Sequence, residues 1–314
     1  MKNNKTKVLV LMIMMVALTG CTNQLKNTEG KPVKDATTGQ TLTSNILCQP
    51  TKQETIDLYK ENGVNLENIS KCENYGISFT GYDGNMFNYI WEKIFVQPLA
   101  WLIIKVGAVI NSYGLSLILT TLFVRLSMVP FTKKSMAQAE NMKKAKPELD
   151  NLEKKYKDKK DREDLMQKSQ EMMLIYKKYG ISPTGGCLVA FIQIPLFFAY
   201  YESISRIPVI FEETFIGFQL GTNPTTAIAN GQWYYAIFII LIVVATYLSF
   251  NSNPSTAMNN DQEKQMKMMM NYMLVFIFIA SLTLPTGIAI YWLTSNLFTI
   301  AQNYYNKRGV KNVK

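Results

Sequence analysis

A single cation inside an apolar segment is the residue of this 314-residue chain best placed for chemistry. Arg125 is the one charged side chain between positions 106 and 132. A cation near the centre of a membrane helix costs at least about 2.5 kcal/mol and usually faces the protein interior or a water-filled cavity. We therefore expect Arg125 to hold its charge in an intramembrane pocket. The alternative is that this long side chain, about 9 Å from the end of the segment at 1.5 Å per residue, reaches the headgroups.

Four polar or aromatic side chains in the apolar segments accompany this cation. Thr121 lies four residues before Arg125 and shares its helix face. Gln193 lies within a second apolar run, and Trp292 and Asn296 share a face of a later one. Together they predict a hydrated, cationic pocket that opens to the cytoplasm or to lipid. The alternatives are hydrogen bonds between helices for Gln193 and Asn296, and simple packing for Trp292.

The composition argues against several other kinds of chemistry. The chain contains no histidine, which is the commonest general base and metal ligand. The sequence has no P-loop, catalytic triad or cluster of metal-ligand residues, so we expect neither an enzyme nor a cofactor or metal site. The net charge of +10 does not indicate nucleic-acid sequence recognition, because no base-reading motif is visible. Basic cytoplasmic loops of a membrane protein explain this charge better.

The first 20 residues have the features of an export signal. Three lysines form a basic start, and positions 8–18 form an apolar core. The sequence LTGC at positions 18–21 then resembles a bacterial lipobox. This pattern predicts a lipoprotein signal peptide over 1–20, cleavage before Cys21, lipid modification of Cys21 such as palmitate, and an exported N-terminus. The alternative is a short apolar anchor with an incidental cysteine.

The region that follows Cys21 is expected outside the cell. Residues 22–44 are rich in Lys, Thr, Asn and Gln, and we interpret them as a linker because they offer little apolar surface. Cys48 and Cys72 lie in the same exported region, where conditions permit a disulfide. The sequence leaves open whether these two cysteines are bonded or remain free thiols.

Charge-free stretches predict an all-α integral membrane protein with five transmembrane helices. The stretch 84–111 mixes aromatic with charged residues, which suits an amphipathic helix at the outer interface. The turn Leu284-Pro285-Thr286-Gly287 divides the last uncharged block into two spans. The expected order is signal peptide 1–20, exported linker and small extracellular segment 21–83, interfacial helix 84–111, span 112–132, cytoplasmic hairpin 133–184, span 185–205, extracellular loop 206–232, span 233–250, cytoplasmic loop 251–268, span 269–284, span 287–305 and basic tail 306–314.

The distribution of basic residues orients these spans. Positions 133–178 hold 14 Lys plus Arg against 9 Asp plus Glu, and the C-terminal tail is also basic. The expected extracellular loop holds one basic residue, Arg206. Because Lys and Arg are enriched in cytoplasmic loops, the N-terminus is expected outside and the C-terminus inside. The lipobox predicts the same orientation independently.

The expected cytoplasmic hairpin reads as two charged helices. Leu149, Leu152 and Tyr156 form an apolar stripe at helical spacing, and a similar stripe runs from Leu165 to Tyr176. The charged sequence at 157–161 is suited to the turn between them. One interpretation is a hairpin that touches a cytoplasmic partner or an incoming chain. The other is a solvated connector whose lysines set the topology and contact anionic lipids.

Three groups of residues together resemble the YidC/Oxa family of membrane protein insertases. The first runs from Tyr113-Gly114-Leu115 through Arg125-Leu126 to Pro130 and precedes a charged hairpin. The others are Pro183 to Cys187 with Ile192-Gln193-Ile194-Pro195, and Pro285-Thr286-Gly287 with Tyr291-Trp292 and Asn296. The order of lipobox, interfacial helix and five spans is similar to the lipoprotein-type members of Gram-positive bacteria. The resemblance covers about 87–305.

The resemblance implies an insertase and chaperone in the bacterial cell membrane, acting alone or with the Sec translocon. A hydrophilic groove, closed toward the outside, would accept the polar part of a nascent membrane protein. Arg125 would be the groove cation, and Thr121, Gln193, Trp292 and Asn296 would line the groove. The implied partners are nascent membrane proteins and membrane lipid, together with the Sec translocon, the ribosome and the receptor of the signal recognition particle. The protein is expected to be a monomer.

Two other classes of protein fit parts of the sequence. A small-solute transporter or channel would also span the membrane, but transporters often have internal repeats with paired broken helices, and no such symmetry is visible. A surface lipoprotein that binds a ligand would have only about 60 exported residues for this task, with little core. Deletion of the exported segment distinguishes the second class, because an insertase is expected to tolerate it.

Overall fold

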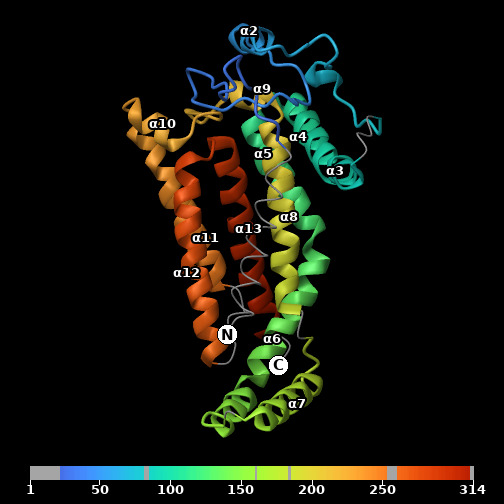
Figure 1. Cartoon of the computed structure of the whole chain (residues 1–314), viewed down its shortest axis with the longest axis vertical. Helices are drawn as coiled ribbons and strands as arrows, with labels where there is room; N and C mark the ends of the chain where they lie inside the picture. Colours follow the sequence, from blue (N-terminus) through green and yellow to red (C-terminus); the bar gives the residue numbers. More distant parts are fainter. Residues whose placement is uncertain (1–21, 81–84, 160, 183–184, 253–259, 312–314) are drawn as a thin grey trace. The chain divides into compact units, whose positions relative to one another are not determined.

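The computed structural model describes residues 22–80, 85–159, 161–182, 185–252 and 260–311 (Figure 1). It is mostly helical, as expected for the all-α class. The chain divides into two compact units. Unit 1 comprises Met1–Thr121, Ile194–Ile239 and Ser281–Trp292, and unit 2 comprises Leu122–Gln193, Ile240–Ala280 and Leu293–Lys314. The predicted signal peptide 1–20 and lipidated Cys21 lie outside the described residues.

The elements follow one another in a simple order along the chain. They are α2 (Gln53–Glu61), η2 (Cys72–Asn74), α3 (Met86–Trp91), η3 (Glu92–Val96), α4 (Gln97–Ile110), α5 (Tyr113–Ser127), α6 (Val129–Lys155), α7 (Arg162–Lys178), α8 (Gly185–Ser205), α9 (Pro208–Glu212), β1 (Thr214–Phe215), β2 (Phe218–Gln219), α10 (Pro224–Ala229), η4 (Trp233–Tyr235), α11 (Ala236–Ser252), α12 (Asn260–Thr283) and α13 (Thr286–Lys311). The strands β1 and β2 form one antiparallel hairpin.

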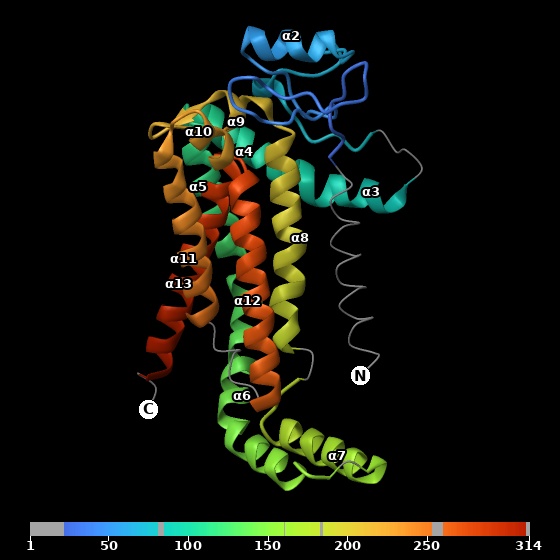
Figure 2. The same ribbon diagram turned by 60° about the vertical axis from the view of Figure 1, so that its left-hand side comes forward.

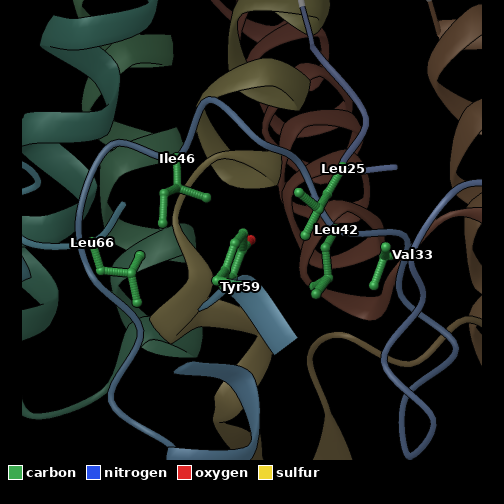
Figure 3. Close-up of a cluster of buried hydrophobic side chains, with 6 residues drawn as sticks. All are labelled: Leu25, Val33, Leu42, Ile46, Tyr59 and Leu66. Carbon is green, nitrogen blue, oxygen red and sulfur yellow. The ribbon is translucent and has the colours of Figure 1, made fainter. Parts of the chain in front are cut away.

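Residues 22–80, which are expected to be exported and are here called the exported module, fold around a small apolar core. Figure 3 shows Tyr59 of α2 between Leu25, Val33 and Leu42 on one side and Ile46 and Leu66 on the other, and all six are buried. The prediction of a linker over 22–44 was therefore wrong. Its few apolar side chains suffice because α2 supplies the rest of the core. Antiparallel bridges such as Gln24↔Thr43 and Lys34↔Thr41 also satisfy the backbone of the segment.

A disulfide closes the second half of the exported module. Cys48 and Cys72 are bonded with an S–S distance of 2.08 Å, and both are buried. Next to the bond, the backbone N–H of Gln49 donates to the carbonyl of Ser70 at 3.0 Å. The loop closed in this way contains α2, so the disulfide holds the helix that carries Tyr59.

The stretch expected at the outer interface is helical from Met86 to Ile110. It begins at Asn85, whose side chain accepts from the backbone N–H groups of Phe87 and Asn88, and it ends at Asn111 with a left-handed φ of 53°. Within the described residues, Met86–Ile110 and Trp233–Ser252 are the two stretches long and apolar enough to cross a membrane by length and composition. The interfacial position of Met86–Ile110 and the number of spans therefore remain predictions.

The boundary between the expected first span and the hairpin lies earlier in the sequence than the predicted position 132. Helix α5 ends at Ser127 and α6 begins at Val129, because Pro130 lies in the first turn of α6, where its missing N–H group is tolerated. Helices α6 and α7 then lie side by side in both views (Figures 1 and 2). The predicted stripe of Leu149, Leu152 and Tyr156 is buried in unit 2.

The turn between α12 and α13 has the predicted break, but α12 begins at Asn260 instead of at 269. The additional residues are mostly Gln, Glu, Lys and Met, which favour helix. The first N–H groups of α13 have no partners within the helix. They donate instead to the loop between β2 and α10, from Thr286 to the carbonyl of Thr222 at 3.0 Å and from Gly287 to that of Leu220 at 2.8 Å.

The hairpin carries two hydrogen-bonded carboxylates that make its stability sensitive to pH. Glu148 accepts from Nζ of Lys178 at 2.5 Å and from the hydroxyl of Tyr179 at 2.8 Å. Glu171 is held in the same way by Lys155 and Tyr156. These hydrogen bonds, first those from the lysines, lower the pKa of both carboxyl groups below the ordinary value of 4.5.

A group whose pKa is lowered by folding stabilises the fold above its unfolded pKa and loses that effect as pH falls through its folded pKa. We therefore expect α7 amides to exchange more slowly in the wild type than in a Glu148→Gln, Glu171→Gln variant at pH 7. Hydrogen exchange should show this difference vanish as the pH falls well below 4.5. A difference that is equally large in strong acid would contradict the role of the two carboxylates. Because both ion pairs are exposed, the effect is expected to be small.

Candidate functional site

Arg125 lies within unit 2, where it is half-buried. Its guanidinium donates a hydrogen bond to the hydroxyl of Ser295 on α13, and Ser295 is 3% exposed. This contact joins α5 to α13 through a charged donor and a neutral acceptor. Ser295 directly precedes Asn296, so the acceptor is the neighbour of the residue predicted from the sequence. This acceptor itself carries no charge.

A line of polar side chains continues from Ser295 along α13. The hydroxyl of Thr299 donates to the carbonyl of Ser295 at 2.9 Å, and Gln302 donates to the hydroxyl of Thr132 on α6 at 2.7 Å. Asn303 donates to the hydroxyl of Ser252 on α11 at 2.9 Å and is 4% exposed. Thr299 lies four positions after Ser295, and Gln302 and Asn303 lie three and four positions after Thr299, so the four residues share one face of the helix. We call Ser295, Thr299, Gln302 and Asn303 the polar seam.

Sequence analysis missed the polar seam although its spacing is visible. Asn296 was singled out because it stands within an apolar run, whereas Gln302 and Asn303 lie near the end of the expected span. Their partners, Thr132 and Ser252, come from segments far away in the sequence. A search for polar residues at helical spacing would have found the face itself, but not what it contacts.

Trp292 and Thr121 belong to unit 1, and both are packed there. The ring of Trp292 meets Phe197 of α8 edge-on with centroids 4.8 Å apart. The neighbouring Tyr291 stacks on Tyr200 at 4.2 Å. The hydroxyl of Thr121 donates to the carbonyl of Leu117 at 2.6 Å, one turn back in its own helix, and Thr121 is 1% exposed. Trp292 is thus part of an aromatic cluster, and the Thr121 hydroxyl bonds to the backbone of its own helix.

The residues predicted for the groove are divided between the two units. Arg125, Gln193 and Asn296 belong to unit 2, while Thr121 and Trp292 belong to unit 1. Gln193 and Asn296 are both half-buried. Arg125 contacts Ser295, the residue directly before the predicted Asn296. No group of three His, Cys, Asp or Glu side chains that could hold a metal ion occurs among the described residues.

A second charged cluster, in unit 1, was not predicted. Arg206 is 5% exposed and donates to Glu202 at 3.0 Å, and it lies 3.4 Å from Glu92. The other oxygen of Glu202 accepts from the indole of Trp91 at 2.9 Å. The Nε of Arg206 donates to the carbonyl of Asn45 in the exported module at 2.6 Å. Arg206 thus joins α8, the start of η3 and the exported module.

The sequence reveals the pair of Glu202 and Arg206 in this cluster, but not the partners of the pair. Glu202 and Arg206 are four apart near the end of an expected span, which is the spacing of a helical ion pair. Their partners Trp91, Glu92 and Asn45 are more than 100 positions away in the sequence. Burial raises the pKa of Tyr75 in the exported module to about 12, and the charge of Arg206 opposes that rise.

Two neighbouring carboxylates in unit 1 each complete a helix N-terminus. Glu212 accepts from the backbone N–H groups of Thr51 at 2.9 Å and Lys52 at 3.0 Å, just before α2. Glu213 accepts from the hydroxyl of Ser112 at 2.8 Å and from the N–H of Tyr113 at 2.5 Å, at the start of α5. Negative charge at these positions also favours the helix dipole. One short segment therefore fixes the exported module and α5 together.

Apolar helices, a cation within one of them and a polar seam are typical of an α-helical membrane protein. Known proteins specify the class further. Residues 105–313 match the family model described as 60Kd inner membrane protein. The chain is 35% identical over 214 residues to "Membrane protein insertase YidC" of Oceanobacillus iheyensis, covering 68% of this chain and 82% of that one. It is 33% identical to "Membrane protein insertase MisCA" of Bacillus subtilis, covering 70% and 80%.

A further similarity is to a solved structure, titled "Active YidC insertase crystal structure with the first transmembrane domain resolved". The TM-score is 0.48 at 24% identity, over 71% of this chain and 48% of that one. The family of this chain is assigned from the family model and the sequence relatives, and not from this solved structure. The chain belongs to the 60Kd inner membrane protein family, the YidC membrane protein insertases. The exported module lies before the region that the family model matches.

The buried charge cluster makes a specific stability prediction. Arg206→Met would leave Glu202 buried without its cation, and breaking a buried pair in this way costs about 3–5 kcal/mol. Adding Glu202→Gln removes the orphaned charge and keeps an acceptor for Trp91, so the double variant should unfold at a higher temperature than the single one. Thermal unfolding of the purified protein measures both. Lys60→Met, an exposed cation on α2, is the matched control and should change stability by less than about 0.5 kcal/mol.

Proposed function

We propose that this insertase guides nascent membrane proteins into the bilayer through a hydrated groove whose cation is Arg125. The single observation that carries the proposal is the hydrogen bond from Arg125 to Ser295 within unit 2. This contact holds a cation beside the polar groups of α13. A cation at such a place attracts the acidic groups of a substrate.

The balance between electrostatic attraction and desolvation favours transient binding of the substrate. At about 4 Å and an effective dielectric of about 20, a carboxylate gains about 4 kcal/mol from a cation. Removing the carboxylate from water offsets this gain by several kcal/mol. An acidic segment would therefore be attracted into the groove without being trapped there. Partitioning of the substrate's own apolar helix into lipid then supplies the direction, and the proposal needs no covalent step or nucleotide.

The polar seam supports a path to this cation. From Ser295 to Asn303 it covers about 12 Å at 1.5 Å per residue. It runs toward the C-terminal end of α13, where the basic tail favours the cytoplasmic side. Hydrogen-bonding groups at each turn would replace water for a polar chain that enters there. In this proposal Gln193 and Asn296 line the groove with Arg125, and Thr121 and Trp292 belong to its wall.

We propose five spans with the N-terminus outside, and an interfacial position for Met86–Ile110. Contacts within unit 1 support the latter. The hydroxyl of Tyr89 donates to Phe79 at 2.6 Å, the side chain of Gln97 accepts from Ser78 at 3.1 Å, and Lys105 donates to Glu73 at 2.7 Å. The exported module thus follows this helix for about 24 Å at 1.5 Å per residue. A helix that contacts an irregular, polar segment over that length is better suited to the membrane surface than to the bilayer interior, where irregular backbone cannot satisfy its polar groups.

The hairpin of α6 and α7 is the proposed contact for cytoplasmic partners. Four large apolar side chains of α7 are exposed, namely Leu165, Met166, Met173 and Leu174. Methionine-rich apolar surfaces adapt to varied partners. The ribosome, the receptor of the signal recognition particle and the Sec translocon are the proposed partners, and the insertase itself is proposed to act as a monomer. The lipoprotein signal, with palmitate on Cys21 in the bacterial cell membrane, is proposed from the sequence.

Exchange of the groove cation tests the proposal. We expect Arg125→Ala to lower insertion of single-span substrates with acidic exported tails about tenfold, which corresponds to about 1.4 kcal/mol. Substrates with neutral tails should be affected less, and Arg125→Lys should restore part of the activity because it keeps the charge. The measurement is protease protection of the substrate in cells depleted of their own insertase.

Arg162→Ala removes an exposed cation from α7 and is the control for net charge. Equal insertion of acidic and neutral tails by wild type and Arg125→Ala would remove Arg125 from the mechanism while leaving the insertase activity intact. Failure of the wild type to insert any substrate, with the protein present in the membrane, would contradict the insertase function of this chain.

A further inference from the structure

The β1–β2 hairpin in unit 1 has an unusual residue at its tip. Phe215 pairs with Phe218, so the turn consists of Ile216 and Gly217. Both have positive φ, 49° and 81°. Turns of this kind favour Asn-Gly, whereas a β-branched residue at positive φ is a strained outlier. The sequence therefore places an isoleucine where the backbone alone would favour asparagine or glycine.

This isoleucine is also one of the most exposed apolar side chains of the described residues. Ile216 is 79% exposed, and in the same loop region Trp233 is 70% and Tyr234 51% exposed. Strain and water contact both oppose an isoleucine at this position. An apolar environment that covers the tip would offset both, because burial of its side chain is favourable.

Aromatic contacts fix the position of the hairpin relative to an expected span. The ring of Phe218 lies 5.3 Å from Tyr234, 5.1 Å from Tyr235 and 4.7 Å from Phe238. Tyr235 ends η4, and Phe238 lies in the first turn of α11. Phe215 also packs closely on Gly114, where an added Cβ would clash with the phenylalanine ring. The hairpin is therefore held at the starts of α11 and α5.

The exposed face of α11 continues the apolar surface of this region. Trp233 is followed at helical spacing by a row of exposed apolar side chains, namely Ile237, Ile240, Leu241 and Val244. Trp233–Ser252 is also apolar and long enough to cross a membrane. Trp and Tyr concentrate where such spans leave the hydrocarbon. We therefore expect Trp233 and Tyr234 to lie at the level of the headgroups. The hairpin lies at the same level, because its Phe218 packs on Tyr234.

We propose that the hairpin is a membrane-contact site, and that Ile216 inserts together with Trp233 into the outer leaflet of the bilayer. The occupant is lipid because the exposed surface is continuous with the lipid-facing side of α11. The inserted tip fixes the depth of the loop that completes α5 through Glu213 and α13 through Leu220. The inference requires α11 to span the membrane, but it does not depend on the groove or on Arg125.

Fluorescence quenching by lipids tests the proposal. An environment-sensitive fluorescent amino acid is placed at Ile216 in the full chain, which is reconstituted into phosphatidylcholine–phosphatidylglycerol vesicles. The control carries the same probe at Asn230, an exposed residue of the same loop. We expect blue-shifted emission and quenching by lipids with a doxyl group near the headgroup at position 216, and neither effect at position 230.

Emission at position 216 as solvent-exposed as that at position 230 would overturn the proposal. A blue shift without lipid quenching, which grows with the ratio of protein to lipid, would indicate a second copy of the chain and would overturn it as well. An Ile216→Asn variant supplies an independent measurement that retains the fold, since Asn suits the positive φ. The change in unfolding temperature that this substitution causes should be more positive in detergent than in vesicles, where the lipid contact of Ile216 is lost. Equal shifts in both would overturn the proposal.

Discussion

The positive charge of Arg125 within an apolar helix is the constraint on which the rest of the membrane region depends. Such a charge is costly in hydrocarbon and has to be solvated by protein or water. In unit 2 a hydroxyl of α13 is one group that solvates it, and the same face of that helix continues as the polar seam. In unit 1 the buried cation Arg206 is instead held by the carboxylates of Glu202 and Glu92.

The segment from Glu212 to Thr222 in unit 1 provides acceptors for the N–H groups at helix starts, which have no partners within their own helices. Glu212 and Glu213 supply carboxylates for the starts of α2 and α5, and the carbonyls of Leu220 and Thr222 serve α13. Three helices from separate parts of the chain thus begin at one short segment. Thr51 and Lys52, which Glu212 binds, lie in the part of the exported module that the disulfide between Cys48 and Cys72 closes. Loss of Glu212 would therefore affect the start of α2, and loss of Glu213 the start of α5.

Local features were predictable from the sequence, and long-range pairings were not. Charge-free runs and the Pro285 turn are local signals, and the structure has helices in these stretches, although α12 begins earlier than expected. The linker prediction failed because the burial of Leu25 depends on Tyr59, which lies 34 positions further on. Arg125 was found because a charge in an apolar run is conspicuous, but its partner Ser295 depends on how two distant helices align. Arg206 was overlooked because it was counted only as a loop charge that helps to set the topology.

The central claim is that water reaches the polar seam from the cytoplasm, and thiol accessibility tests it most directly. Thr299→Cys places a thiol on the seam, and Leu297→Cys places one on an exposed apolar position of the same helix. Both are made in a chain with Cys187→Ser and treated with a charged, membrane-impermeant thiol reagent in vesicles of either orientation. The account predicts reaction at 299 from the cytoplasmic side and none at 297. An unreactive thiol at 299, or equal reaction at both positions, would contradict it.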